Sequence, residues 1–317
     1  MTTLSVVIPV YGCAGCLTEL YKRLVSSLEK ITHEFEIIFV DDCGPDHSWK
    51  ILSELALANS QVKVIRLSKN FGQHLAITAG LAESSNEWVI VMDCDLQDPP
   101  EEIPRLLNTA QQGFDIVFAR RIQKQHSGFR KNLSNLYFKF MDLVSKHKFN
   151  AELGSFSLIS RKVVNAFLKM SDSNRHYLFI LYWLGFKTGY IEYEHKERFC
   201  GKSSYTLKTL IKHALNGLLF QSTTLLHWII YLGFSVSAMG FSMAIYFIYR
   251  YYVHSAYPGW TSLIVLILVI GGIILSSLGV VGLYIAGIFD QVKGRPLYVI
   301  DERISSDELR QHSQASE

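Results

Sequence analysis

The 317-residue sequence lacks an excess of charge of either sign, since 31 lysines and arginines face 28 aspartates and glutamates. This balance gives no electrostatic reason to expect nucleic acid as a partner, because such binding needs a strongly basic surface. The sequence also lacks a secretory signal pattern. Met1-Thr2-Thr3 leads directly into an apolar stretch, without a basic segment ahead of a long apolar core. We therefore expect no nucleic-acid partner and no secretory signal.

Cysteine is scarce, with five residues at positions 13, 16, 43, 94 and 200. Cys13 and Cys16 have the spacing of a redox or metal-binding pair and follow a predicted strand. A zinc site would need two further ligands, and no second cysteine pair or histidine cluster accompanies them. We expect reduced thiols in a cytosolic compartment and no disulfide framework. A functional Cys13–Cys16 pair is the alternative.

Two glycine-rich nucleotide-binding motifs are also missing. No GxGxxG follows the first predicted strand, and GxxxxGK[ST] occurs nowhere in the chain. In dinucleotide-binding folds and P-loop enzymes these glycines let the backbone wrap around phosphates, so both classes are excluded. A nucleotide bound here would have to be held by carboxylates and a metal ion.

The N-terminal part of the sequence instead alternates short apolar runs with stretches of helical periodicity. The apolar residues of the helical stretches recur every three or four positions. Strands that alternate with helices predict an α/β domain with a mostly parallel sheet and right-handed crossovers. The predicted strands are 4–10, 35–40, 62–67, 88–92 and 115–119.

Two of these strands end in acidic residues. Asp41-Asp42 follows the second strand, and Asp93 and Asp95 follow the fourth. Ligands of open α/β sheets bind at the carboxyl edge of the strands. Two carboxylates at such an edge suit a divalent cation that also holds a diphosphate. The alternative is an ordinary acidic turn, because Asp and Pro are common turn residues.

A run of basic residues follows the fifth strand. Charge runs usually form a solvated surface, but this one directly follows a strand on the same sheet edge, so we expect contact with phosphate. A short apolar segment at 154–159 and a helix from Arg161 come next. The basic run comprises Arg120, Arg121, Lys124, His126, Arg130 and Lys131.

Long apolar runs are confined to the C-terminal third. Residues 228–249 and 262–289 are uncharged, and each is long enough to cross a hydrocarbon core of roughly 30 Å. Basic residues flank their outer ends, whereas the connection at 250–261 holds one arginine. The positive-inside rule therefore predicts a hairpin with both chain ends in the cytoplasm. A basic and an apolar face at 205–215 predict a helix lying in the membrane interface.

Four regions are therefore expected. They are a cytosolic α/β domain at 1–200, a juxtamembrane amphipathic helix at 201–224, two transmembrane helices within 225–290, and a cytosolic tail at 291–317. The two helices would cover about 226–252 and 261–289. The polar composition of the tail predicts disorder from residue 301 onward.

Six sequence elements occur in the order found in a known enzyme family. On these motifs the chain resembles the family 2 glycosyltransferases of the polyprenyl-phosphate type. That group includes dolichyl-phosphate mannose synthase, bactoprenol glucosyltransferase and the undecaprenyl-phosphate aminoarabinose transferase. The resemblance covers the chain to about Tyr298 and implies a Rossmann-like GT-A fold followed by interfacial helices and a two-helix transmembrane hairpin. The elements are Pro9-Val10-Tyr11, Val40-Asp41-Asp42, Asn70-Phe71-Gly72-Gln73, Asp93 to Pro100, Arg198 to Tyr205, and Gly294-Arg295-Pro296.

The resemblance implies a metal-dependent transferase of the bacterial cytoplasmic membrane. Its reaction would be inverting transfer of a sugar from a nucleotide-sugar, with UDP expected by analogy, to undecaprenyl or another polyprenyl phosphate. The lipid-linked sugar would serve cell-envelope glycan or O-antigen (lipopolysaccharide) modification. Mg²⁺ or Mn²⁺ would be the cofactor, membrane lipid a further partner, and a homo-oligomer such as a tetramer the assembly.

The resemblance also implies roles for individual residues. Asp95 would be the principal metal ligand, and Asp93 would contact the nucleotide-sugar and the metal. Arg120 would join these two as a catalytic residue. The donor would lie against Pro9, Tyr11, Val40, Asp42, Asp93 and Gln97. The lipid phosphate would lie against Arg130, Lys131, Ser155, Arg198 and Lys202.

The sequence departs from the family pattern in three places. Gly12-Cys13 replaces Asn-Glu, which removes an expected contact to the base. Ser203-Ser204-Tyr205 replaces Ser-Lys-Tyr, and whether Lys202 substitutes for the displaced lysine is open. Ser155 replaces the proposed general base. An alcohol acceptor needs such a base, but a phosphate monoester, with a second pKa of about 6, is already mostly anionic. We therefore expect Ser155 to be a contact and not a base.

Two other functions stay open on the sequence alone. A processive polysaccharide synthase shares the acidic strand end, although its usual downstream Gln-x-x-Arg-Trp element does not occur here. A non-catalytic membrane scaffold or lipid-carrier binding protein is the second. Loss of Asp42, Asp93 or Asp95 would have favoured that second function, and all three are present.

Overall fold

The computed structural model of the protein describes residues 2–122, 153–172, 175–194 and 259–305, with individual residues between 229 and 253. The chain divides into two compact units. The first combines Met1–Ser127, Asn150–Ser203 and Arg295–Glu317, and the second combines Gly128–Phe149 and Ser204–Gly294.

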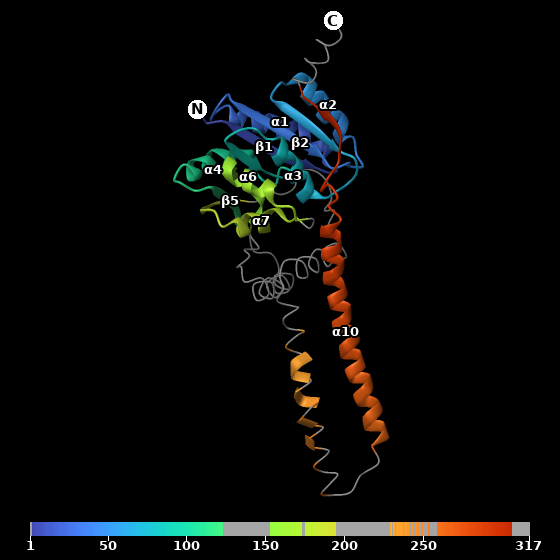
Figure 1. The fold of residues 1–317 in the computed structure, drawn as a ribbon. Helices are drawn as coiled ribbons and strands as arrows, with labels where there is room; N and C mark the ends of the chain where they lie inside the picture. The colour runs from blue at the N-terminus through green and yellow to red at the C-terminus, as the bar shows by residue number, and fades with distance from the viewer. Residues whose placement is uncertain are drawn as a thin grey trace. The chain divides into compact units, whose positions relative to one another are not determined.

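The first unit is built on an eight-stranded sheet with the order β7-β5-β6-β4-β1-β2-β3-β8. Figure 1 shows the paired strands β1 and β2 next to each other in this sheet. The four central strands β4, β1, β2 and β3 are mutually parallel, as are β5 and β7. β6 runs antiparallel to β4 and β5, and β8 runs antiparallel to β3. The prediction of a mostly parallel α/β sheet is confirmed. The strands are β1 (Leu4–Val10), β2 (Phe35–Asp41), β3 (Val62–Leu67), β4 (Trp88–Val91), β5 (Ile116–Ile122), β6 (Leu153–Ser160), β7 (Thr188–Glu194) and β8 (Ile300–Ile304).

Helices cover both faces of this sheet. Apolar residues of α1, α2 and α4 belong to one hydrophobic cluster, and those of α3, α6 and α7 belong to the other. Successive strand residues point to opposite faces, so Val6 and Ile8 join the first cluster while Val7 joins the second. Burial on both faces explains why the central strands are almost continuously apolar. The helices are α1 (Ala14–Leu28), α2 (Ser48–Ala58), α3 (Gln73–Glu83), the 3₁₀ turn η1 (Pro100–Glu102), α4 (Ile103–Ala110), α6 (Arg161–Lys169) and α7 (Tyr177–Leu184).

The pairing of β1 with β4 positions the acidic residues. The two strands are parallel, with Val7 opposite Val91. Because both chains run in the same direction, the loop after β1 and the loop after β4 leave the sheet at the same edge. The first of these loops contains Tyr11 and Cys13, and the second begins at Asp93.

The C-terminal tail differs from its prediction. Disorder was expected from residue 301, but Ile300–Ile304 forms β8 at the edge of the sheet beside β3. Arg303 pairs with Glu83 at 2.8 Å, and Arg66 pairs with Glu302 at 3.6 Å. Polar composition misled the prediction because an edge strand needs few apolar residues. Two further elements, α7 and β7, were not predicted.

The second unit contains the long helix α10 (Trp260–Val292) of 33 residues. In the part of the chain that the structure describes, one segment, Ile270–Val292, is long and apolar enough to cross a membrane, with a mean hydropathy of 2.1. The predicted helix at 201–224 lies outside the described residues. So does most of the predicted first span, although the residues described between 229 and 253 are helical. The two-helix hairpin therefore stays a prediction.

Candidate functional site

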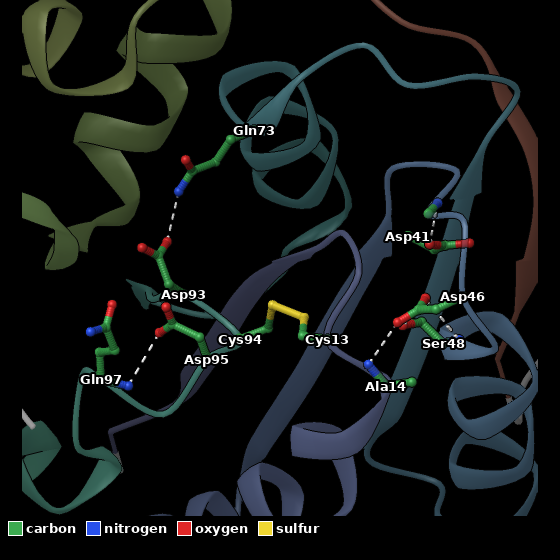
Figure 2. Close-up of a disulfide and its surroundings, with 11 residues drawn as sticks. Cys13, Ala14, Asp41, Asp46, Ser48, Gln73, Asp93, Cys94, Asp95 and Gln97 are labelled. Atoms are coloured by element: carbon green, nitrogen blue, oxygen red, sulfur yellow. Dashed lines mark hydrogen bonds between the residues drawn. A yellow bond between two sulfur atoms is a disulfide. The ribbon is translucent and has the colours of Figure 1, made fainter. Parts of the chain in front are cut away.

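The carboxylate of Asp93 is held by two side-chain donors, one from a helix and one from a strand of the sheet. Gln73, the first residue of α3, donates from Nε2 to Asp93 Oδ1 at 2.7 Å (Figure 2). Ser155 on β6 donates from Oγ to the same oxygen at 2.7 Å. Both bonds go to Oδ1 of the carboxylate. The expected contact of Ser155 with the lipid phosphate stays a prediction.

The electrostatics around Asp93 favour a bound cation. Burial raises the pKa of Asp93 to about 6, and the neighbouring carboxylates of Asp98 and Asp95 act in the same direction. The Ser155 hydroxyl and the charge of Arg121 oppose that rise in pKa. Three carboxylates beside one guanidinium leave an excess of negative charge, which a divalent cation would neutralise.

Asp95 and its neighbours form a tight turn. Asp95 Oδ1 accepts a hydrogen bond from the backbone N–H of Gln97 at 3.2 Å (Figure 2). Leu96 between them has a φ of 60°, a left-handed conformation that is unfavourable for a branched side chain. Leu96 is only 2% exposed, so burial of its side chain holds it there. The stretch from Asp93 to Asp98, called the acidic loop below, is therefore locally strained.

Asp42 shapes a neighbouring loop. Its carboxylate is buried and accepts backbone hydrogen bonds from Phe71 at 2.7 Å and Gly72 at 2.9 Å. Gly72 has a φ of 96°, which a residue with a Cβ rarely adopts. Burial raises the pKa of Asp42 to about 6, although the two hydrogen bonds favour the charged form. Since Gln73 follows Gly72, Asp42 indirectly places the donor that contacts Asp93.

The cysteines behave differently from the prediction. Cys13 and Cys94 form a disulfide, with 6.5 Å between their Cα atoms and a sequence separation of 81 (Figure 2). The expectation of reduced thiols without a disulfide is wrong for this pair. Sequence spacing drew attention to Cys13 and Cys16, whereas the parallel pairing of β1 and β4 brings Cys13 to Cys94. Cys16 is buried and is not part of this disulfide.

The structure separates the two arginines that begin the basic run. Consecutive strand residues face opposite sides. Arg120 lies 3.8 Å from Glu192 and 5.3 Å from the ring centre of Tyr190. Arg121 Nη2 lies 3.4 Å from Asp98 Oδ1 on the side of the acidic loop. The sequence placed Arg121 in the basic run and Asp98 in the acidic motif, but it gave an individual catalytic role to Arg120 alone. The alternation of side chains along a strand was a usable signal for separating the two arginines.

The remaining predicted site residues fall into two groups. In the first group, Tyr11 is 43% exposed in the loop after β1, Gln97 is half-buried, and Pro9 and Val40 are buried within the sheet. A donor would therefore meet Tyr11 and Gln97 side chains more readily than Val40. The second group lies outside the described residues, so its role stays a prediction: Arg130, Lys131, Arg198 and Lys202.

The described residues include no group of three or more His, Cys, Asp or Glu side chains arranged to hold a metal. Asp93 and Asp95 would supply two oxygen ligands to a bound cation. Mg²⁺ is commonly held in this way, with one or two carboxylates and the remaining positions filled by substrate phosphates and water. The donor set is compatible with Mg²⁺ or Mn²⁺ bound together with a diphosphate.

Comparison with known proteins identifies extensive similarities. The family model described as "Glycosyl transferase family 2" matches residues 5–168. The uncharacterized glycosyltransferase YkcC of Bacillus subtilis (strain 168) is 33% identical over 308 residues, covering 96% of this chain and 95% of its own. The bactoprenol glucosyl transferase of Shigella phage SfII is 33% identical over 299 residues, covering 94% and 97%. Glucosyl-3-phosphoglycerate synthase from Mycobacterium tuberculosis, solved with Mn²⁺, UDP and phosphoglyceric acid, gives a TM-score of 0.49 at 15% identity, covering 71% and 78%.

Proposed function

The chain belongs to glycosyl transferase family 2, and from this premise we propose that it transfers a sugar from a nucleotide-sugar to a polyprenyl phosphate. Its mostly parallel, Rossmann-like sheet is the GT-A fold of that family. The relatives named bactoprenol glucosyl transferase, similar over most of the chain, support a lipid phosphate as acceptor. The donor is proposed to be UDP-linked and the acceptor undecaprenyl phosphate.

The observation that carries this proposal is the contact between Ser155 and Asp93. A hydroxyl, not a carboxylate, lies at the β6 position that faces Asp93, and it donates its hydrogen bond to Asp93. Such a site suits an acceptor that is already an anion. A phosphate monoester meets this condition near neutral pH because its second pKa is about 6. An alcohol acceptor would instead need a base to remove its proton.

In the proposed reaction a phosphate oxygen of the acceptor attacks the anomeric carbon. The bond from that carbon to the diphosphate breaks, the configuration inverts, and the nucleoside diphosphate leaves with the electron pair. Asp95 and Asp93 would hold Mg²⁺ or Mn²⁺, which supplies neutralisation of the leaving diphosphate. Gln73 and Ser155 orient Asp93, and the guanidinium of Arg121 offsets part of the carboxylate charge.

The proposed location is the cytoplasmic face of the bacterial inner membrane. The exposed, apolar α10 supports association with a bilayer. A second transmembrane helix, cytoplasmic chain ends and a homo-oligomer are part of the same proposal. The lipid-linked product is proposed to serve envelope glycan or O-antigen modification.

The test uses the full-length protein in detergent or nanodiscs with undecaprenyl phosphate and a panel of nucleotide-sugars. Mass spectrometry of the lipid should find one added sugar, dependent on Mg²⁺ or Mn²⁺ and abolished by EDTA. Asp95→Asn should lose the product, whereas Asp172→Asn, at an exposed carboxylate, should keep it. A product carrying a growing polysaccharide would indicate a processive synthase. Lipid binding without product from any donor would indicate a scaffold. Either result overturns the proposal.

A further inference from the structure

The acidic loop needs support from its surroundings because its backbone is strained at Leu96. Strained residues persist where neighbouring structure determines them more strongly than their own preference. Gln73 and Ser155 act on the side chain of Asp93. A separate set of contacts acts on the other end of the loop, at Asp98.

Asp98 is fully buried, with 0% of its surface exposed. Its Oδ1 accepts a hydrogen bond from the hydroxyl of Tyr193 and another from Arg121 Nη2 at 3.4 Å. The backbone N–H of Asp93 also favours the charged form of this carboxylate. Through Arg121 and Tyr193, Asp98 connects the acidic loop to β5 and β7. Since the side chain has no exposed surface, it contributes to the site through Asp93 and not by direct contact with a ligand.

Arg121 and Tyr193 complete a closed triangle with Asp98. They face each other across paired strands, and Arg121 Nε donates to the Tyr193 hydroxyl at 3.1 Å. A buried carboxylate is tolerated when it is paired and hydrogen-bonded, and both conditions are met here. The ring of Tyr193 packs edge-on against Phe156, with 5.7 Å between ring centres. This contact restricts the orientation of the Tyr193 ring and therefore the position of its hydroxyl.

The backbone of β6 leaves room for this triangle. A Cβ built on Gly154 would lie 2.8 Å from Arg121 Nη2, which is too close for a real side chain. Gly154 directly precedes Ser155, the donor to Asp93. One β-strand therefore serves both ends of the acidic loop, because it supplies a donor for Asp93 and space for the arginine that pairs with Asp98.

We propose that Asp98, Tyr193 and Arg121 form a buried clasp that holds Asp93 and Asp95 in the orientation needed to bind the cation and the donor diphosphate. The three are positioning residues and do not touch the substrate. This inference rests on the proposed function, since it assigns the clasp to the same donor site. Its physical basis is the closed set of hydrogen bonds that joins a strained loop to two strands.

The test compares substitutions at two buried tyrosines, each of which removes one phenolic hydroxyl group. Tyr193→Phe removes the hydroxyl that donates to Asp98, and Tyr177→Phe removes a hydroxyl bonded to Ser157, with both tyrosines 2% exposed or less. Mn²⁺ binding to the full-length protein in detergent, with and without UDP, is measured by electron paramagnetic resonance. We expect Tyr193→Phe and Asp98→Asn to weaken Mn²⁺ binding about tenfold or more and to raise the donor KM. The KM for the lipid should change less than twofold. Tyr177→Phe should bind Mn²⁺ like the unchanged protein.

The double variant Asp98→Asn/Tyr193→Phe should bind Mn²⁺ only slightly more weakly than the weaker-binding single variant. The effects of substitutions within one hydrogen-bond network are not additive. Mn²⁺ affinity within twofold of the unchanged protein in Tyr193→Phe would overturn the clasp, and so would equal weakening in Tyr177→Phe. If Asp98→Asn does not fold, the Mn²⁺ affinity of Tyr193→Phe alone tests the clasp. Binding of Mn²⁺ and UDP without a lipid product would overturn the proposed function alone. Absence of Mn²⁺ binding to the unchanged protein would overturn both.

Discussion

The disulfide between Cys13 and Cys94 joins the loop after β1 to the acidic loop after β4. Cys94 lies between Asp93 and Asp95, so the bond restrains the backbone that carries both carboxylates (Figure 2). Asp93 is thus held in two ways, by the covalent bond at the next residue and by the donors Gln73 and Ser155.

Loss of this disulfide should lower stability and loosen the acidic loop. A bond that closes a loop of this length contributes about 2–4 kcal/mol by restricting the unfolded chain. Cys13→Ser/Cys94→Ser should therefore unfold at a lower temperature in thermal scans and show a higher donor KM. Cys43→Ser, at a free and half-buried cysteine, is the matched control. Peptide mass spectrometry under non-reducing conditions checks the bond, and alkylation of Cys13 and Cys94 without prior reduction would contradict it.

Ser155→Ala should reduce turnover without abolishing it. The substitution removes one of two side-chain hydrogen bonds to Asp93 Oδ1, and Gln73 retains the other. A neutral donor to a charged acceptor is worth about 1.5–3 kcal/mol, so kcat/KM should fall by roughly one to two orders of magnitude. Steady-state kinetics with the lipid acceptor measures the effect. Complete loss of turnover with intact donor and lipid binding would show instead that Ser155 has an essential chemical role.

Gly154→Ala should impair the site although the added group is a single methyl. The new Cβ would lie 2.8 Å from Arg121 Nη2, so the guanidinium would have to shift from the position in which it contacts Asp98. We expect weaker Mn²⁺ binding and a higher donor KM. Gly189→Ala is the comparison, because its Cβ would press at 2.9 Å on Phe114 and not on Arg121. Equal effects of the two substitutions on Mn²⁺ affinity would mean that Gly154→Ala acts by general disruption of the fold and not through Arg121.

The stability of the fold should depend on pH through Asp42. Burial raises the pKa of this carboxyl to about 6 in the folded chain, above its ordinary value of 3.8. The folded state therefore binds the proton more tightly, and the stabilisation from this group is lost as pH rises through 4 to about 6. Thermal unfolding of the full-length protein and of Asp42→Asn should be measured across this pH range. The stability of the unchanged protein relative to Asp42→Asn should fall as the pH rises. A difference that is constant or increases over this range would contradict the assignment.

Much of the architecture could be predicted because it depends on local patterns. The apolar run Leu4–Val10 and the acidic residues after Val91 can each be recognised from a short stretch of neighbouring sequence. Strand and helix alternation then limits the topology, so the parallel sheet and the placement of Asp93 at its carboxyl edge follow. The strand Ile300–Ile304 was not predicted because an edge strand has a weak pattern of apolar residues.

The sequence by itself therefore determined the α/β sheet, the acidic strand end and the family. The tertiary structure decided which residues meet there: Cys13 with Cys94, Ser155 and Gln73 with Asp93, and Arg121 with Asp98. The physical reason is distance along the chain. Periodicity reports a residue's environment over one or two turns or strands, whereas these contacts join segments about 20 to 80 residues apart through strand order and register.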